Sequence, residues 1–267
     1  MSDENKKARS VLIGCPTAGG LDPDPNRWIK GLLGIIDNVR REGFSYAFLA
    51  PYRMSWEIGN NQIWDTAFNY KFDYILRMDD DIWGIPDNAF SKLLEANKDV
   101  IGAAYPLRTF PYSFAAFDRT DKTKSLTDTW MTQTLDLREV PAVGIQKVDI
   151  VGFGLTLIKT EKFRYLERPM FKDLGTIPDD TFFAQKCLDN NIEQYVDFDI
   201  KMAHREVTPM NKLYLFNADA RGLLQNGMIK GGNVFHDSLI EQFGADGRKD
   251  IDKIKGLYIP ETGNVIS

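Results

Sequence analysis

The chain has 267 residues, of which 43% are apolar and 27% are charged. These fractions are typical of globular proteins and indicate neither a disordered chain nor a fibrous repeat, and the length fits one large domain or two small ones, of which we expect the first. The formal net charge of −5, with the basic residues scattered along the chain, argues against nucleic-acid backbone binding as the main function. Cys15 and Cys187 cannot form a disulfide framework, no apolar run approaches roughly 18 residues, and residues 1–10 lack an apolar signal core, so we expect a cytoplasmic protein.

The first part of the chain alternates strand patterns with helix patterns. We expect strands at residues 11–16, 46–50, 73–78 and 99–105, and helices at residues 26–42, 58–70 and around 86–94. Asp24 and Pro25 are suited to begin the first helix, and Gly43 to end it. This alternation predicts an α/β fold with a mainly parallel central sheet flanked by helices, and a nucleotide-binding half at about residues 11–105.

The second part of the chain has a different pattern. Alternating aromatic and polar residues predict strands or hairpins in YSFAAF (residues 112–117) and TWMTQTL (residues 129–135). Residues 143–163 predict two strands broken near Gly152 and Gly154 and then a short helix, residues 179–191 a helix, and residues 195–204 a half-buried strand. We therefore expect one domain at residues 1–210, whose acceptor half is about residues 106–210. Residues 211–267 are then a C-terminal extension or lid, with one helix near residues 237–243.

Three consecutive carboxylates, Asp79 to Asp81, directly follow the apolar strand at residues 73–78. Ligands of open α/β sheets bind beyond the carboxyl ends of the strands. Clustered carboxylates repel one another and are costly to desolvate, and a divalent cation commonly resolves this conflict. In an extended chain Asp79 and Asp81 point the same way, and their oxygens suit Mg²⁺ or Mn²⁺ bridging a diphosphate. A solvated acidic turn is the competing interpretation.

Two further positions carry candidate chemistry. His204 ends a strand, where a neutral imidazole is a competent Mn²⁺ ligand beside carboxylates, and an ordinary surface histidine is the alternative. Asp179 and Asp180 open a helix. One carboxylate suffices as the helix cap, which leaves Asp180 available as a general base.

Taken in order, these segments form a recognisable series. They read CPT (15–17), GNN (59–61), MDDD (78–81), GFG (152–154), PDD (178–180) and AHRE (203–206). The series resembles the family 2-like glycosyltransferases of the GT-A fold, especially the compact bacterial and phage members. This resemblance implies a Rossmann-like mixed sheet and a metal-dependent transfer of a sugar from a nucleotide-diphosphate sugar to an acceptor hydroxyl, with Mn²⁺ or Mg²⁺ as the cofactor.

The resemblance also implies a nucleotide-sugar site. Pro16 and Thr17 match the loop that lines the base and ribose. Asn61 matches the asparagine of an Ala-Arg-Asn segment of the family, but this sequence has GNN there and lacks the arginine. We assign Asp79 and Asp80 to the nucleotide-sugar side of the triplet.

The remaining roles concern the metal and catalysis. By the same resemblance, Asp81 and His204 are the metal ligands, and Asp180 is the base for an inverting reaction, with Asp179 beside it. Gly152 and Gly154 match a strand that passes close beneath the donor sugar, where a side chain would obstruct it. Lys230, in GMIKGGN, is assigned to the diphosphate.

Several alternatives stay open at this point. A metal-dependent nucleotidyltransferase or phosphohydrolase also uses paired aspartates, although the loop CPTAGGLDPDP lacks the basic residue that nucleotidyltransferases usually carry there. A catalytically inactive glycan-binding protein is the non-enzyme alternative. The acceptor could be a glycan, a lipid-linked glycan, a protein or a modified nucleobase, and retaining GT-A enzymes share the same ligands.

Overall fold

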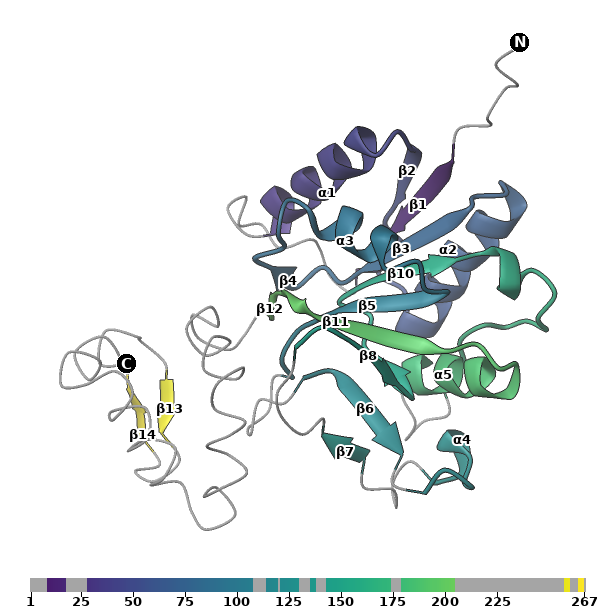
Figure 1. The fold of residues 1–267 in the computed structure, drawn as a ribbon, viewed down its shortest axis with the longest axis vertical. Helices are drawn as coiled ribbons and strands as arrows, with labels where there is room; N and C mark the ends of the chain where they lie inside the picture. Colours follow the sequence, from purple (N-terminus) through teal and green to yellow (C-terminus); the bar gives the residue numbers. More distant parts are fainter. Residues whose placement is uncertain are drawn as a thin grey trace.

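The computed structural model describes residues 9–17, 28–107, 114–119, 121–129, 135–137, 143–173, 179–204, 257–259 and 264–266. Its centre is a seven-stranded sheet in the order β2-β1-β3-β10-β5-β11-β8 (Figure 1). The strands are β1 (Ser10–Gly14), β2 (Ser45–Leu49), β3 (Tyr74–Met78), β5 (Val100–Ala104), β8 (Ile145–Val148), β10 (Leu155–Lys159) and β11 (Gln194–Lys201). All run in one direction except β8 and β10, which run in the other. The expected mixed, mainly parallel sheet is confirmed.

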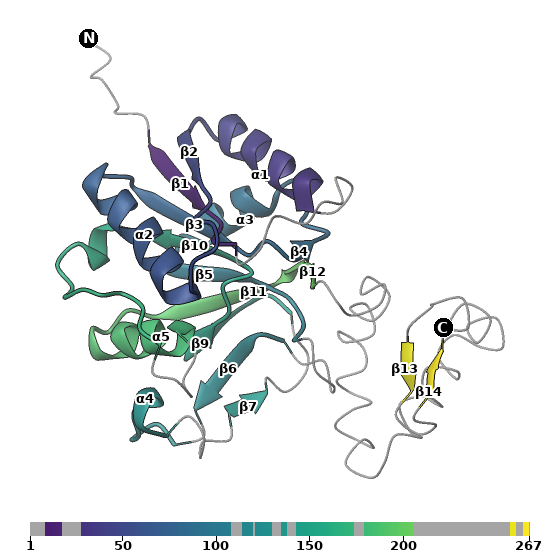
Figure 2. The same ribbon diagram turned by 180° about the vertical axis from the view of Figure 1, so that it is seen from behind.

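Helices cover both faces of this sheet. They are α1 (Lys30–Arg41), α2 (Trp56–Asn69), α3 (Ala89–Glu95) and α5 (Asp179–Asp189). The pair α1 and α3 lies on one face, and α2 and α5 lie on the other, which Figure 2 shows from behind. The central strands β1, β3, β5 and β10 are mostly apolar because alternate residues enter two cores. Leu12 lies in the same core as Trp64 of α2, whereas Ile13 lies in the same core as Ile35 of α1.

The helix boundaries follow from local signals. Gly43 has a φ of +75°, a left-handed conformation that glycine adopts without strain, and it ends α1 as expected. The side chain of Ser55 accepts a hydrogen bond from the backbone N–H of Ile58 (3.3 Å). This cap makes α2 begin two residues before the predicted start. Asp24 and Pro25 lie outside the described residues.

Shorter elements surround the main sheet. A two-stranded sheet joins β4 (Ile82–Trp83) to β12 (Ala203–His204), and a three-stranded sheet has the order β7 (Leu135–Leu137), β6 (Ala116–Arg119) and β9 (Ile150–Val151). The others are α4 (Leu126–Thr129), the 3₁₀ turn η2 (Glu161–Phe163), and the paired strands β13 (Leu257–Ile259) and β14 (Asn264–Ile266). Within the described residues, no helix combines the length and the apolar character needed to cross a bilayer.

Three predictions of strands need correction. The strand expected at residues 195–204 ends at Lys201 as β11 of the main sheet, and residues 203–204 form β12, which pairs with β4 in a separate sheet. The strand expected before Gly152 is divided at Asp149, so that β8 joins the main sheet and β9 joins the small one. The strand expected from residue 129 is wrong at Thr129, which ends α4. The side chain of Gln185 explains this helix, because its Oε1 accepts the backbone N–H of Leu126 (2.6 Å) in the first turn of α4. The helix expected near residues 237–243 lies outside the described residues.

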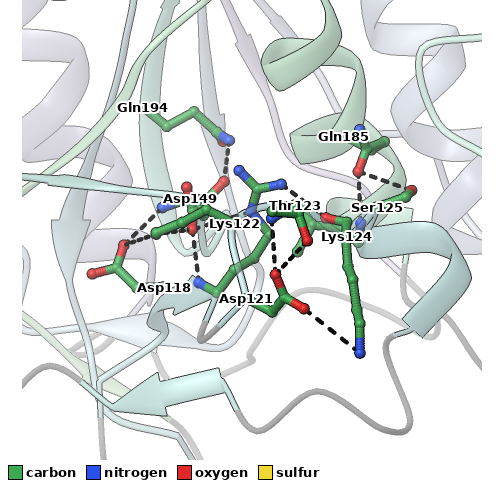
Figure 3. A network of polar contacts seen from close by, with 11 residues as sticks. Asp118, Asp121, Lys122, Thr123, Lys124, Ser125, Asp149, Gln185 and Gln194 are labelled. Atoms are coloured by element: carbon green, nitrogen blue, oxygen red, sulfur yellow. Dashed lines mark hydrogen bonds and ion pairs between the residues drawn. The ribbon is translucent and has the colours of Figure 1, made fainter.

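Asp149 is the polar centre of the division between the two sheets. Its carboxylate accepts the backbone N–H of Arg119 (2.7 Å) and contacts the ammonium of Lys122, and its backbone carbonyl accepts from Nε2 of Gln194 (2.6 Å) (Figure 3). Burial would raise the pKa of Asp149, but the bonds and charges of Lys122 and Arg119 outweigh burial and lower it. The network therefore fixes the small sheet to the edge of the main sheet.

The same region also anchors α5. Figure 3 shows Gln185 of α5 beside Ser125, whose hydroxyl donates to the Gln185 side chain (3.1 Å). Together with the bond from Leu126, this contact ties the middle of α5 to the start of α4. The first turn of α5 carries Asp179 and Asp180, so these contacts help to position it.

Candidate functional site

The three consecutive carboxylates follow β3, and each has a different partner. For Asp79 that partner is Arg77: the guanidinium NH2 lies 2.9 Å from Oδ1 of Asp79. The backbone of Asp79 is also fixed, since its N–H donates to the carbonyl of Gly154 (3.1 Å) and its carbonyl accepts from the indole N–H of Trp28 (2.9 Å). Asp79 therefore belongs to a rigid ion pair.

Arg77 is a buried cation, with only 3% of its surface exposed. Its Nε donates to Oδ1 of Asn60 (2.7 Å), and NH1 donates to the carbonyl of Met78. The guanidinium carbon lies 5.6 Å from the ring centre of Trp56 and 5.9 Å from that of Phe153. Each guanidinium nitrogen thus has a protein partner, which offsets the cost of burying the charge.

Asp80 is joined to the loop that follows β1. The hydroxyl of Thr17 donates a hydrogen bond to the Asp80 side chain. Burial, reinforced by the charge of Asp79, raises the pKa of Asp80, and the Thr17 bond opposes this effect. Thr17 is itself buried and donates its backbone N–H to the carbonyl of Pro51 (2.8 Å). The structure therefore brings Thr17, and Pro16 beside it, to the acidic triplet.

Asp81 faces His204 across the two-stranded sheet. In the antiparallel pair of β4 and β12, His204 lies opposite Ile82, the residue that follows Asp81 (Figure 1). As a result Oδ2 of Asp81 lies 3.3 Å from Nε2 of His204, and each side chain is 12% exposed. The strand pairing brings together residues that are far apart in the sequence.

The pair has the donor chemistry of a divalent-metal site. Nδ1 of His204 lies 3.0 Å from the carbonyl of Pro106, and because a carbonyl can only accept, Nδ1 carries the hydrogen. Nε2 and the Asp81 oxygen then face each other and need a proton or a cation between them. One imidazole nitrogen and one carboxylate oxygen suit Mn²⁺ or Mg²⁺. Within the described residues, no group of three or more His, Cys, Asp or Glu side chains that could hold a metal ion is found.

A pocket of about 180 Å³ adjoins the triplet. Its lining residues come from α2, β3, the end of β5, the loop before β10 and the start of α5. They are Trp56, Asn60, Arg77, Asp79, Tyr105, Phe153 and Asp180. The structure thus places Asp180 in the same pocket as Asp79, as a half-buried carboxylate in the first turn of α5. Asp179 begins this helix, and its side chain lies outside the described part.

Gly152 and Gly154 lie beside the ring of Tyr105. A Cβ atom at Gly152 would lie 2.4 Å from the hydroxyl oxygen of Tyr105, and one at Gly154 would lie 2.6 Å from Cε1 of the same ring. Both positions therefore exclude any larger residue. The two glycines therefore make room for the side chain of Tyr105, a packing role that the sequence did not reveal.

Asn61 does not line the pocket. Its side-chain N–H donates to the carbonyl of Phe171 (2.8 Å), and its Oδ1 accepts the backbone N–H groups of Met170 (3.0 Å) and Phe171 (3.1 Å). The preceding residue, Asn60, is the one that reaches Arg77. Lys230 lies outside the described residues.

The sequence interpretation missed four pocket residues, which are Asn60, Arg77, Tyr105 and Phe153. Arg77 carried a signal, since it is the only charged residue in the strand YILRM. Asn60 and Asn61 are adjacent and identical in type. Which of the two faces the pocket depends on the rotation of α2 about its axis, which the sequence does not show. Tyr105 resembled an ordinary aromatic residue at the end of a strand.

No family model and no curated protein matches this sequence. Solved structures similar to this chain include A197 from STIV, with 20% identity over 73% of this chain and 85% of that chain and a TM-score of 0.48. They also include the catalytic domain of Drosophila beta1,4galactosyltransferase 7 in complex with xylobiose, with 13% identity and a TM-score of 0.38. A mutant of that enzyme, in complex with manganese, UDP-Gal and xylobiose, has 13% identity and a TM-score of 0.36.

This chain covers 66% of each galactosyltransferase chain, slightly less than two thirds, and the matches span 75% of this chain. These TM-scores are all below 0.5 and carry no weight for what this chain does. The observed sheet is consistent with the expected GT-A-like fold. Membership of family 2 stays a prediction.

Proposed function

We propose that this protein is a metal-dependent glycosyltransferase that moves a sugar from a nucleotide-diphosphate sugar to an acceptor hydroxyl. The observation that supports this most is the pairing of β4 with β12, which joins Asp81 to His204. This pair lies at the carboxyl end of β3, beside a pocket that contains Asp79 and Asp180. Ligand sites of open α/β sheets form at this edge.

In this proposal Asp81 and His204 hold Mn²⁺ or Mg²⁺. A divalent cation bound there would stabilise the negative charge that develops on the leaving diphosphate. The carbonyl of Pro106 fixes the tautomer and orientation of the His204 ring, as partners behind metal-binding histidines commonly do. Arg77 neutralises the charge of Asp79, so that Asp81 rather than Asp79 binds the metal.

The donor is assigned to two neighbouring regions. Pro16, Thr17 and Asp80 form the nucleotide side, since the Thr17 hydroxyl joins the loop after β1 to the triplet. The pocket of about 180 Å³ is smaller than the roughly 300–1,000 Å³ of drug-sized ligand sites. It therefore suits one sugar ring, with Trp56 and Phe153 available to pack on the ring.

Asp180 is assigned the role of general base. As the acceptor oxygen attacks the anomeric carbon, Asp180 takes the hydroxyl proton, the bond from that carbon to the diphosphate oxygen breaks, and a nucleoside diphosphate leaves. Attack opposite to the leaving group inverts the anomeric configuration. The N-terminus of α5 favours the ionised form of this carboxylate, which is the form that a base requires.

The experiment is a panel of UDP- and GDP-sugars incubated with the protein, with and without Mn²⁺. Glycan, lipid-linked glycan, protein and modified-nucleobase acceptors are tested in parallel. We expect Mn²⁺-dependent cleavage of one donor between the sugar and the diphosphate, with inversion visible in the proton NMR spectrum of the product. Release of sugar 1-phosphate together with a nucleoside monophosphate would instead indicate a phosphohydrolase, and release of sugar 1-phosphate with the nucleotidyl group transferred to another acceptor would indicate a nucleotidyltransferase.

Variants separate the assigned roles. Asp81→Asn and His204→Ala should each weaken Mn²⁺-dependent binding of the nucleoside diphosphate, measured by calorimetry. Asp180→Asn should leave this binding intact and slow transfer by about 10²–10⁴-fold. Asp37→Asn, at an exposed position of α1, is the control and should change neither quantity. Donor binding without turnover by the unaltered protein would indicate a glycan-binding protein and refute the transferase assignment.

A further inference from the structure

Tyr105 occupies the centre of the proposed site. It follows β5, is 7% exposed, and lines the pocket together with Asp79 and Asp180. On the metal side its ring packs edge to face against His204, with 5.4 Å between the ring centres and 89° between the ring planes. Tyr105 is thus the side chain that joins the pocket to the metal pair.

The ring of Tyr105 is held in one position. Gly152 and Gly154 border it so closely that a Cβ atom at either would overlap the hydroxyl or the ring. The backbone carbonyl of Tyr105 also accepts the N–H of Ala115 (2.9 Å). A side chain enclosed in this way presents its hydroxyl at a fixed point, which selective recognition of a ligand requires.

The hydroxyl group has one hydrogen bond and a remaining donor. The backbone N–H of Gly154 donates to the phenol oxygen. A tyrosine hydroxyl, with its ordinary pKa of about 10, keeps its proton at neutral pH and is therefore able to donate. Among the described residues, no hydrogen-bond acceptor for this proton is found, and a buried tyrosine hydroxyl usually has one.

The other strong donor of the pocket is already engaged. Nε, NH1 and NH2 of Arg77 contact Asn60, Met78 and Asp79 respectively. The three guanidinium nitrogens of Arg77 are thus already paired with protein groups, whereas the Tyr105 hydroxyl still has a proton to donate. A sugar ring offers hydroxyl oxygens as acceptors in the same pocket.

We propose that Tyr105 is a specificity-determining residue whose hydroxyl donates a hydrogen bond to a hydroxyl oxygen of the sugar in this pocket. This inference rests on the glycosyl transfer proposed above. It predicts selection among sugars that differ at one hydroxyl. A site with a fixed partner for a substrate hydroxyl rejects the analogue that lacks it far more strongly than an apolar site does.

The test is Tyr105→Phe, which removes one oxygen atom and keeps the ring that fills the space beside the glycines. The probes are UDP-glucose, UDP-galactose, GDP-mannose, their monodeoxy-sugar analogues, and UDP and GDP without sugar, all with Mn²⁺. We expect kcat/KM for the accepted sugar to fall by about 10-fold or more, the magnitude of one lost hydrogen bond. Binding of UDP or GDP should stay unchanged. The unaltered protein should reject one deoxy analogue, and the variant should lose that particular discrimination.

The control is Tyr195→Phe. This hydroxyl donates to Glu193 (2.6 Å) near the start of β11, at the opposite end of the sheet from Tyr105, so its loss should change no kinetic value. Melting temperatures show whether both variants are folded. Suppose that the unaltered protein turns over a donor, but Tyr105→Phe has the same kcat/KM on every analogue, or weakens the binding of UDP and GDP as much as that of the nucleotide sugar. The role of Tyr105 is then refuted, while the proposed glycosyl transfer stands. If the unaltered protein cleaves no donor, the glycosyl transfer fails and this inference fails with it.

Discussion

The buried pair of Arg77 and Asp79 gives a quantitative test of how the acidic triplet is stabilised. Arg77→Met keeps a long apolar side chain and removes the guanidinium. Removing one partner of a buried ion pair costs about 3–5 kcal/mol, because the other charge is left buried without compensation. The Asp79 side chain is 18% exposed, so water screens part of this charge, and we expect a loss near the lower end, about 3 kcal/mol.

The assay is urea denaturation followed by circular dichroism, together with thermal melting. At roughly 2–4 °C for each kcal/mol in a protein of this size, the melting temperature should fall by about 6–12 °C. The matched control is Arg41→Met. Arg41 forms a surface pair with Asp37, with side-chain exposures of 57% and 65%, and its loss should cost less than about 0.5 kcal/mol.

A second substitution tests the physical cause. Adding Asp79→Asn to Arg77→Met removes the carboxylate that was left without a cation, so the double variant should recover part of the lost stability. If Arg77→Met costs no more than Arg41→Met, or if the double variant is the less stable of the two, the buried charge is not what the arginine compensates.

Three further predictions concern the supporting structure. Gly154→Ala should cost about 1–3 kcal/mol in unfolding free energy, because the new Cβ overlaps Tyr105, whereas Gly34→Ala in α1 should be neutral or stabilising; equal urea midpoints would contradict this. The folded-state pKa of Asp149 lies below the ordinary 3.8, so its contribution to stability is complete above that value and is lost as the pH falls further; Asp149→Asn should flatten this acid-dependent loss, measured as urea midpoints between about pH 5 and pH 2. Asn61→Ala should cost about 2–3 kcal/mol through its lost backbone hydrogen bonds while leaving turnover per folded molecule unchanged, and a selective loss of donor binding would instead support a ligand contact.

Much of the fold could be predicted because its signals are local. The apolar strands, the amphipathic face of α1 and the glycine that ends it depend on residues near one another in the sequence. The division at Asp149 could not be predicted, because it depends on Arg119, Lys122 and Gln194 from other elements. Continuous strand propensity across that point gave no sign of a change of sheet.

The candidate site divides in the same way. The sequence by itself determined that three carboxylates follow a buried strand and that a second acidic pair opens a helix, since both are properties of consecutive residues. Only the tertiary structure decided the partners: Arg77 for Asp79, Thr17 for Asp80 and His204 for Asp81. It also decided that Asn60 rather than Asn61 lies at the pocket, and that Tyr105 fills the space beside the two glycines. The physical reason is that strand pairing and helix rotation set these contacts between distant segments, and neither is encoded in any single segment.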